Sequence, residues 1–327
     1  MRLLVIEFVT GGGFAGTALP ESLAAEGEMM LQAVLTDLHA TPDVSVCVAR
    51  DARLSALPSW CEVLAVDGAA WDRWADGLDP MGAVLPIAPE SDGVLERLNG
   101  LVLAHGRQLL GCAPTAVHIA ASKTRTAAEL LRAGIAVIPT TFAAAQLPDS
   151  DHGWVVKPDE GAGSEHTYHL HDADAVRALL RSAEIAKPVV QPFVPGEPVS
   201  LSLLCANGRA RVLACNRQVQ ARAGGALRQS GVVVNGAVEY IDVMQALAER
   251  LCAVLPGLRG YVGVDLIVTG RGPVVVEVNP RLTTAYAGLS DSLGVNAFEL
   301  IRRACANDAS VFDVALETRP VEVRAYG

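Results

Sequence analysis

Cysteines at metal-ligand or disulfide spacing are absent from this sequence. Its seven cysteines are scattered, without a C-x-x-C pair or a histidine at metal-ligand spacing. Such cysteines are typical of small buried apolar residues in a reducing compartment, which argues against a disulfide framework or a zinc site. No apolar run reaches membrane-spanning length, and the first strand, which contains Glu7, lacks the features of a signal peptide. We therefore expect a soluble, cytoplasmic protein.

Basic side chains are also scarce. The 327 residues contain 26 Lys and Arg against 36 Asp and Glu, a net charge of -10. This balance argues against nucleic acid or an anionic membrane as the main partner. A hydrophobic content of 51% indicates a well-buried globular protein with two or three subdomains. The expected partners are small molecules, and a homodimer is compatible with these features.

The order of predicted elements changes along the chain. The first hundred residues alternate strands with helices, which predicts a parallel sheet flanked by helices. Later strands follow one another closely, which predicts a mixed, largely antiparallel sheet. We therefore predict an α/β fold that becomes α+β in its second half, with domains at 1–110, 111–188 and 189–327. The strands are predicted at 3–9, 43–48, 61–66, 82–87, 135–139, 154–158, 189–194, 199–206 and 209–218, and the first helix at 21–38.

A hairpin near the end of the chain places acidic groups inside apolar strands. Two runs of β-branched residues flank a turn at 270–272, which is typical of a hairpin loop. With a three-residue loop, Thr269 pairs with Pro273. Counting back along both strands then places Asp265 directly opposite Glu277.

Asn279 shares a strand face with Glu277 because side chains alternate with a period of two. Two neighbouring carboxylates are costly to bury without a cation between them. Asp265, Glu277 and Asn279 offer only oxygen ligands, which suits magnesium with its remaining ligands from water and phosphates. The alternative is a solvated hairpin face with incidental acids.

Two lysines precede this hairpin in unusual settings. Lys123 begins a predicted helix, and Lys157 lies in an otherwise apolar strand. A glycine-rich stretch with Gly161, Gly163 and Ser164 follows Lys157 directly. Backbone amides of such a loop can hold phosphate oxygens while the lysine supplies charge. Alternatively, Lys157 is a strand-end residue whose ammonium reaches solvent.

An extended apolar segment consists of Gln191, Pro192, Phe193 and Val194, and a Pro-Gly turn with Glu197 follows it. Main-chain groups of such a segment can bind an adenine edge, and the Glu197 carboxylate can accept hydrogen bonds from ribose hydroxyls. Pro-Gly turns with a glutamate are common, so this pattern gains its meaning only from the other motifs.

The glycines at 11–16 match G-x-G-x-x-G, the dinucleotide-binding fingerprint. In that fingerprint the glycine turn leads straight into a helix, whereas here 17–22 intervene. The acidic residue expected about twenty positions later is also not at a strand end, because Asp37 falls inside the predicted helix. We therefore predict a flexible glycine loop beside an active site, or a long connection, and keep a nicotinamide site as an alternative.

In this order, the two lysines, the glycine loop, the extended segment and the hairpin resemble the ATP-grasp superfamily of carboxylate-amine ligases. The resemblance covers about 116–308 and implies one nucleotide site, with ATP and Mg²⁺ as cofactors. Many members have an acidic residue where this chain has Gln191 and Pro192, so backbone contacts are expected there. The implied roles are phosphate contacts from Lys123 and Lys157, an adenine hinge at Gln191, Pro192, Phe193 and Val194, a ribose contact from Glu197, and magnesium ligands Asp265, Glu277 and Asn279.

A narrower set of motifs is similar to the ligases that join glutamate to tyramine or tyrosine in methanofuran and methylofuran biosynthesis. Related ligases with other substrates share several of these motifs. The segments that carry the likeness lie at 3–9, 26–30, 215–218, 224–225 and 280–286.

The chemistry implied is transfer of the ATP γ-phosphoryl group to a carboxylate, followed by attack of an amine to form an amide. Phosphoryl transfer depends on positioning and on charge neutralisation. Lys157 and Arg281 are expected to offset developing negative charge, and Gly161, Gly163 and Ser164 to close over the site.

Four further residues are candidates for substrate contacts. Arg217 can bind a substrate carboxylate in bidentate geometry, although either it or Arg281 could instead form a surface ion pair. Glu7 and Glu28 are candidates for the acceptor amine, with a solvated helix position as the alternative for Glu28. Tyr286 could stack on an aromatic amine or belong to the core.

Four hypotheses follow. The first is the glutamate-to-tyramine or tyrosine ligase, and its nearest rival is another amide-forming ligase on the same scaffold. A nicotinamide oxidoreductase that uses 11–16 and a non-catalytic nucleotide sensor complete the set.

Overall fold

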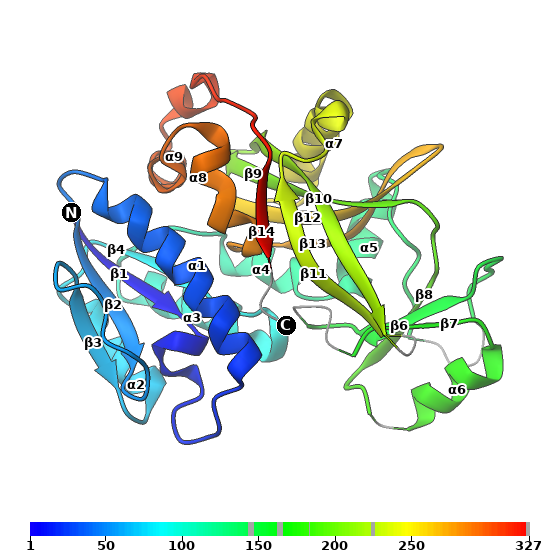
Figure 1. The fold of residues 1–327 in the computed structure, drawn as a ribbon, viewed down its shortest axis with the longest axis horizontal. Helices are drawn as coiled ribbons and strands as arrows, with labels where there is room; N and C mark the ends of the chain where they lie inside the picture. The colour runs from blue at the N-terminus through cyan, green and yellow to red at the C-terminus, as the bar shows by residue number, and fades with distance from the viewer. Residues whose placement is uncertain (143–146, 162–165, 183, 224–225, 325–327) are drawn as a thin grey trace.

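The protein folds around two β-sheets, which lie on opposite sides of the molecule in Figure 1. The computed structural model describes residues 1–142, 147–161, 166–182, 184–223 and 226–324. Within these residues, no helix is long and apolar enough to cross a membrane.

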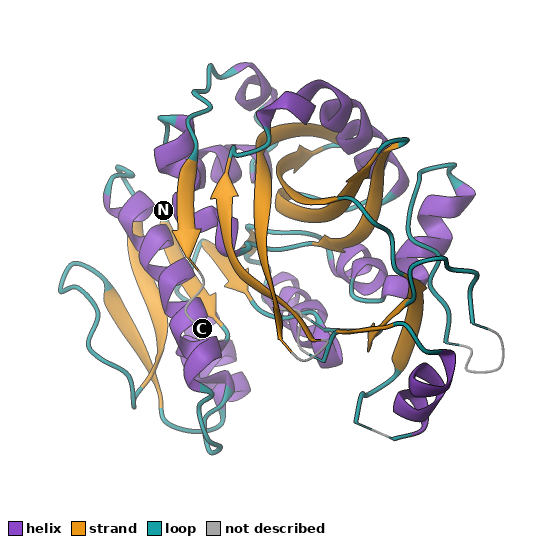
Figure 2. Ribbon diagram, turned by 45° about the vertical axis from the view of Figure 1, so that its right-hand side comes forward, coloured by secondary structure: helices purple, strands orange, loops and turns teal. Residues whose placement is uncertain are grey.

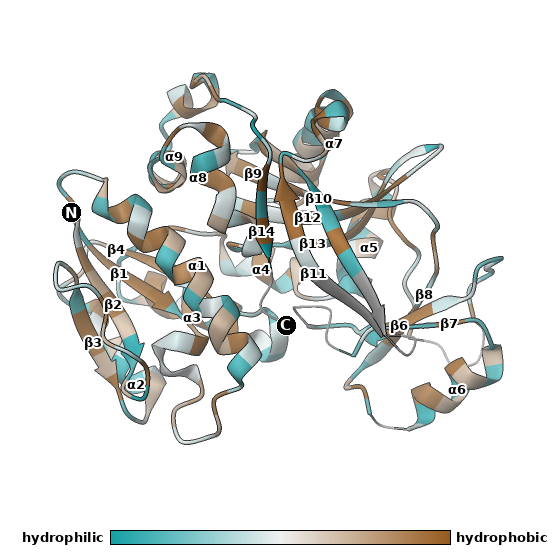
Figure 3. Cartoon of the chain, in the orientation of Figure 1, coloured by the Kyte–Doolittle hydropathy of each residue, from teal (hydrophilic) through white to brown (hydrophobic). Residues whose placement is uncertain are grey.

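The first sheet is parallel, with strand order β3-β2-β1-β4-β5. Its strands are rich in Leu, Val and Ile, and Figure 3 shows them mostly brown. The elements of this part are β1 (Arg2–Glu7), β2 (Ser45–Asp51), β3 (Glu62–Val66), β4 (Ala83–Ile87), β5 (Gln108–Leu109), η1 (Val9–Gly13), α1 (Glu21–His39), α2 (Ala70–Leu78), η2 (Ser91–Gly93) and α3 (Val94–Ala104).

Side chains of β1 alternate between two helical layers. Leu3 and Val5 belong to the core formed with α1, whereas Leu4 and Ile6 pack in the core with α2 and α3. Both faces of the sheet are therefore covered, as expected for a parallel sheet.

The second sheet is antiparallel and strongly curved, and Figure 2 shows its strands between helices. Its order is β13-β12-β9-β10-β11-β7-β6-β8, and β14 pairs with β11. The strands are β6 (Trp154–Pro158), β7 (Tyr168–Leu170), β8 (Pro188–Pro192), β9 (Glu197–Ala206), β10 (Arg209–Ala223), β11 (Ala226–Val234), β12 (Gly260–Thr269), β13 (Gly272–Asn279) and β14 (Val321–Arg324).

Helices cover both faces of this sheet. On one face α7 packs with α4 and α5, and on the other face α9 packs with the 3-10 turn η4. The remaining helices and turns are α4 (Pro114–Ala120), α5 (Lys123–Arg132), α6 (Ala173–Arg181), η3 (Val238–Tyr240), α7 (Ile241–Val254), η4 (Thr284–Gly288), α8 (Leu289–Leu293), α9 (Ala297–Cys305) and η5 (Ala309–Asp313).

The predicted change from a parallel α/β half to a mixed α+β half is confirmed, and the domain limits remain predictions. One expected strand is wrong. Residues 135–139 form a single bridge, Val137 to Val275, because the chain meets β13 at one point only.

The glycine segment at 11–16 lies in the long connection between β1 and α1, which is the second of the two expected alternatives. Gly12 has φ +95°, and a Cβ there would lie 2.4 Å from Val66. Arg53 donates to the carbonyls of Phe14 and Thr17, and Trp74 donates to the carbonyl of Gly11. The segment ends well before α1, so these glycines do not form the helix N-terminus that a dinucleotide site requires.

Candidate nucleotide and metal site

The two predicted acids do lie opposite each other, but the loop between their strands is shorter than expected. Thr269 pairs with Gly272, so the turn has two residues and not three. A register shift between Leu266 and Asp265 leaves Val276 as an extra residue in β13. This bulge restores the pairing of Asp265 with Glu277.

Asp265 accepts hydrogen bonds from two neighbouring amides. Gln218 Nε2 lies 2.7 Å from Asp265 Oδ1, and Asn279 Nδ2 lies 3.1 Å from Asp265 Oδ2. The Asn279 amide thus uses its NH₂ group here, which leaves its carbonyl oxygen as a possible ligand.

The two carboxylates differ in electrostatic environment. Burial and the neighbouring charge of Glu277 raise the pKa of Asp265. Burial alone would also raise the pKa of Glu277, but Lys123 and Lys157 outweigh it and lower that pKa. The two lysines therefore offset the negative charge of Glu277 more than that of Asp265.

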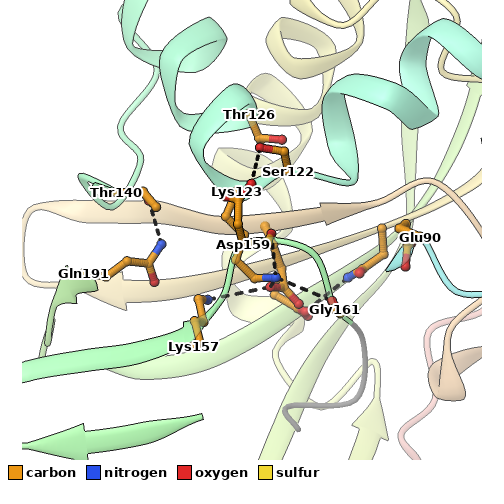
Figure 4. A network of polar contacts seen from close by, with 12 residues as sticks. Glu90, Ser122, Lys123, Thr126, Thr140, Lys157, Asp159, Gly161 and Gln191 are labelled. Atoms are coloured by element: carbon orange, nitrogen blue, oxygen red, sulfur yellow. Dashed lines mark hydrogen bonds and ion pairs between the residues drawn. The ribbon is translucent and has the colours of Figure 1, made fainter. Parts of the chain in front are cut away.

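Both predicted lysines converge on Glu277 from different elements. Figure 4 shows Lys123 and Lys157 near each other, with Asp159 beside them. Lys123 Nζ lies 3.5 Å and Lys157 Nζ 3.7 Å from Glu277 Oε2. Both lysines are buried. Burial lowers the pKa of Lys157 to about 8, although Glu277 opposes the shift. An anionic ligand would stabilise both ammonium groups in this setting.

Asp159 fixes the position of Lys123 and was not singled out from the sequence. Its carboxylate accepts from Ser122 Oγ at 2.6 Å and from the Thr124 amide at 2.8 Å. Lys123 Nζ lies 3.3 Å from the Asp159 carbonyl and 3.4 Å from that of Gly161. Asp159 thus ties the start of α5 to the end of β6, next to the glycine-rich stretch.

A cavity of about 170 Å³ extends from these lysines along β8 and β12. Its acidic and basic groups lie together, and the rest of its wall consists of apolar side chains together with Thr167, Gln191, Gln218 and Gln220. One end is thus suited to phosphates and the other to a flat apolar ring. The lining includes Ile138, Val155, Pro192, Phe193, Val194, Leu266, Ile267 and Val276.

The extended segment at 191–194 forms the apolar end of the cavity. Gln191 Nε2 donates to Thr140 Oγ1 at 2.8 Å, so its side chain is engaged with the protein. The Phe193 ring stacks on His169, with centroids 3.9 Å apart and planes 10° apart. These contacts hold the segment in place beside the cavity.

The hairpin residues fit a magnesium ion. Asp265, Glu277 and Asn279 offer oxygen donors on one face, and the raised pKa of Asp265 indicates a local shortage of positive charge. Among the described residues, no group of three or more His, Cys, Asp or Glu side chains could hold a metal. Two carboxylates match an ion that takes its other ligands from water and phosphates.

Two sequence families match the parts of the chain just described. Residues 120–285 match the family described as ATP-grasp domain, and 44–117 match the pre ATP-grasp 3 domain. The chain belongs to the ATP-grasp family. The ATP-grasp match contains both lysines and the complete hairpin.

Two similar proteins are tyramine–L-glutamate ligases. The chain is 28% identical over 230 residues to the tyramine–L-glutamate ligase of Methanocaldococcus jannaschii, covering 70% of this chain and 65% of that protein. The tyramine–L-glutamate ligase of Methanocaldococcus fervens is also 28% identical over 230 residues, covering 70% and 68%. The match thus spans less than two thirds of the first relative.

Solved structures share the ATP-grasp fold. One structure is described as an ATP-grasp superfamily protein from Archaeoglobus fulgidus. It has a TM-score of 0.74 and 23% identity, with 99% of this chain and 92% of that chain covered. The L-amino acid ligase from Bacillus licheniformis has a TM-score of 0.65 and 15% identity, with 98% and 77% covered.

Glu197 does not line the cavity, so the structure does not support its predicted contact with the ribose. Gly196 and Pro198 line the cavity, and Glu197 between them extends from the opposite strand face. Its carboxylate pairs with Arg217 and accepts from the Tyr240 hydroxyl at 2.9 Å. A proline therefore occupies the cavity-facing position.

Arg217 also lies outside the cavity. Its Nε donates to the Gly236 carbonyl at 3.0 Å, and its terminal nitrogens pair with Glu197 and Glu239. The neighbouring residue, Gln218, faces Asp265, so Arg217 must extend from the other side of β10. The prediction that Arg217 binds a substrate carboxylate in this cavity is therefore wrong.

Two more substrate candidates are already engaged by the protein. The buried Tyr286 hydroxyl donates to Asp37 Oδ2 at 2.6 Å, so the core alternative replaces the stacking role. The half-buried Glu28 on α1 pairs with the buried Arg50 and accepts from Gln32 at 2.8 Å. Neither residue lines the cavity.

Glu7 and Arg281 lie near the carboxyl ends of strands of the first sheet. Glu7 is buried at the end of β1 and accepts from the Thr10 amide at 2.7 Å. Burial raises its pKa. Arg281 is largely buried and pairs with Glu90, a residue that the sequence did not suggest.

Gly161 lies at the cavity wall, whereas Gly163 and Ser164 fall outside the described residues. Sequence reasoning also missed Gln218 and Gln220, which line the cavity. These two glutamines are two positions apart on β10, so they share a strand face. Such a pair of polar residues on one strand is a sequence signal that could have identified them.

Proposed function

We propose that this chain is an ADP-forming ligase that activates the carboxylate of L-glutamate and joins it to the amine of tyramine or tyrosine. The named relatives support this substrate class, and the ATP-grasp fold supports the use of ATP. The product would be an amide of the kind used in methanofuran-type cofactors.

One observation carries the proposal. Lys123 and Lys157 approach the same oxygen of Glu277, beside Asp265, in a cavity that continues into an apolar cleft. Buried ammonium groups next to a carboxylate pair are arranged to receive an anion together with a divalent cation. An ATP triphosphate with magnesium meets both requirements.

The chain's residues would bind and orient the two reacting groups. The apolar end near Phe193 and Val194 would hold adenine, and the two lysines would bind phosphate oxygens. A glutamate carboxylate oxygen would attack the γ-phosphorus, releasing ADP and giving an acyl phosphate. The amine nitrogen would then attack the acyl carbon, releasing phosphate and losing a proton. Arg281 would stabilise the negative charge that develops in these steps.

Magnesium, when bound, would neutralise phosphate charge at Asp265, Glu277 and Asn279. The Asn279 amide also holds Asp265 in place through its 3.1 Å hydrogen bond. Gln218 holds the other oxygen of the same carboxylate. These two amides would keep the carboxylate oriented toward the ligand.

An ADP-release screen tests the proposal. The purified chain would be incubated with ATP, Mg²⁺ and L-glutamate, together with tyramine, tyrosine or other amines, and product masses would be read out. We expect ADP in equal amount to an amide of glutamate with tyramine or tyrosine. An amide with a different pair of substrates would favour another ligase on the same scaffold. Nucleotide binding without turnover in every combination would favour a nucleotide sensor.

A further inference from the structure

Glu90 joins the two halves of the molecule at the proposed site. It follows β4 in the first sheet, and its carboxylate oxygens lie 3.0 and 3.1 Å from Arg281 Nε. The two residues are 191 positions apart. Both side chains are largely buried, at 4% and 12% exposure. An ion pair this buried is costly to break from one side, so it fixes where the guanidinium lies.

Arg281 connects directly to the metal end of the site. Its amide donates to the Asn279 carbonyl at 2.8 Å, and its Nη1 donates to the Leu282 carbonyl at 3.0 Å. Glu90 uses only Nε, so further donors of the planar guanidinium remain for other acceptors. Held in this way, the guanidinium can offer a forked pair of donors to an oxyanion.

The position of Glu90 in the first sheet is also informative. In the parallel strand order β3-β2-β1-β4-β5, the chain adds β2 and β3 on one side of β1 and then β4 and β5 on its other side. Ligands of open parallel sheets bind outside the carboxyl ends of the strands at such a switch point. Glu7 ends β1 opposite Ile87, and Glu90 follows three residues later. Arg281 therefore enters the crevice from the second half of the chain and meets Glu90 there.

We propose that Glu90 is a positioning residue, which holds the Arg281 guanidinium in the orientation needed for the transfer steps. It acts through Arg281 and not on the substrate. Nucleotide binding lies elsewhere, at the lysines and the extended segment, so Glu90 should affect turnover and leave ATP affinity unchanged. This inference rests on the proposed ligase function.

The first test is Glu90→Gln, which keeps the shape of the side chain but removes its charge. We expect kcat to fall about tenfold or more, because a small displacement of a reacting group is costly, while KM for ATP stays within about twofold. Glu90→Asp should retain more activity than Glu90→Gln. Glu62→Gln is the matched control, since it removes an exposed glutamate that pairs with Arg2 on the same sheet. A wild-type kcat for Glu90→Gln would overturn the inference.

A double-variant experiment distinguishes positioning from a general structural role. If Glu90 acts through Arg281, adding Glu90→Gln to Arg281→Ala should lower kcat no further. Free guanidinium should partly restore Arg281→Ala, and this rescue should be lost when Glu90→Gln is added. Equal rescue in both backgrounds, or fully additive losses, would contradict the inference. If Glu90→Gln does not fold, the rescue is compared with Glu90→Asp, in which we expect it to weaken.

Failure of the inference and failure of the proposed function are separable. A wild-type chain that forms no amide from any substrate pair would defeat the function. An active wild type with a fully active Glu90→Gln variant would defeat the inference alone.

Discussion

At the scale of single residues, Glu277 is the carboxylate at which the buried charges of the site meet. Its carboxylate meets both buried lysines, and it lies opposite Asp265 across the hairpin. Only three lysines occur in the whole chain. That scarcity, combined with the position of Lys157 in an otherwise apolar strand, is a sequence signal for an anion site.

Replacement of Glu277 tests the metal assignment. We expect Glu277→Gln to lower kcat by about 10²-fold or more, because loss of a group that stabilises transition-state charge has effects of this size. The fold should persist, as checked by circular dichroism. Glu322→Gln, an exposed carboxylate on β14, is the control and should leave kcat unchanged. Wild-type turnover in Glu277→Gln would remove Glu277 from the site.

Replacement of Lys157 tests the phosphate assignment. We expect Lys157→Ala to weaken ATP binding about 10- to 100-fold, which corresponds to one charge-assisted hydrogen bond. Calorimetric titration with ATP measures the effect. Lys187 is the matched control, since its ammonium is exposed and pairs with Glu160 on the surface. Equal affinities of Lys157→Ala and Lys187→Ala for ATP would contradict the role of Lys157.

At the scale of elements, the pairing of β12 with β13 could be predicted from the sequence, but the loop length and the bulge between them could not. The alternation of apolar residues identified β12 and β13, and it correctly placed Asp265 opposite Glu277. The loop length was wrong by one residue, and the bulge at Val276 compensated for that error. A bulge has no clear sequence signature, so the correct pairing depended on two features that offset each other.

Orientation on a strand was the main source of error in the site. Glu197 and Arg217 have the right chemistry for ligand binding, but each extends from the strand face that is turned away from the cavity. A one-residue difference reverses the face of a side chain. Contacts between distant segments, such as Glu90 with Arg281, leave no local pattern to read.

The η1 turn gives a prediction at this scale. Gly12 and Gly16 both have positive φ, but only at Gly12 would a Cβ meet another residue, Val66. Gly12→Ala should therefore lower the free energy of unfolding by about 1–3 kcal/mol, from backbone strain plus overpacking. Gly16→Ala carries the backbone strain alone and should lose less. Denaturant unfolding measures both, and equal losses would show that the contact with Val66 does not matter.

At the scale of the whole molecule, Asp37 joins α1 to the C-terminal segment. Its Oδ2 accepts from the Tyr286 hydroxyl at 2.6 Å and from Ser290 Oγ at 2.8 Å. Burial raises the pKa of Asp37 despite these hydrogen bonds. The folded chain therefore holds this proton more tightly than the unfolded chain does.

The sign of the pH dependence follows. Between the usual Asp pKa of about 4 and the raised value, the folded state binds more protons, so stability is lost as pH rises through this window. Asp37→Asn removes this titration and should flatten the decline, while buried Glu7 continues to contribute. Urea unfolding at a series of pH values measures the slope. Asp174→Asn, at an exposed position on α6, should retain the wild-type slope, and an unchanged slope in Asp37→Asn would contradict the account.

The central claim is that ATP activates a carboxylate as an acyl phosphate in the cavity formed by the two lysines and the hairpin. The most direct measurement uses L-glutamate labelled with ¹⁸O in its carboxylates, together with ATP, Mg²⁺ and tyramine or tyrosine. The account predicts that one ¹⁸O atom passes into the released phosphate for each amide formed. Amide formation with unlabelled phosphate would contradict it.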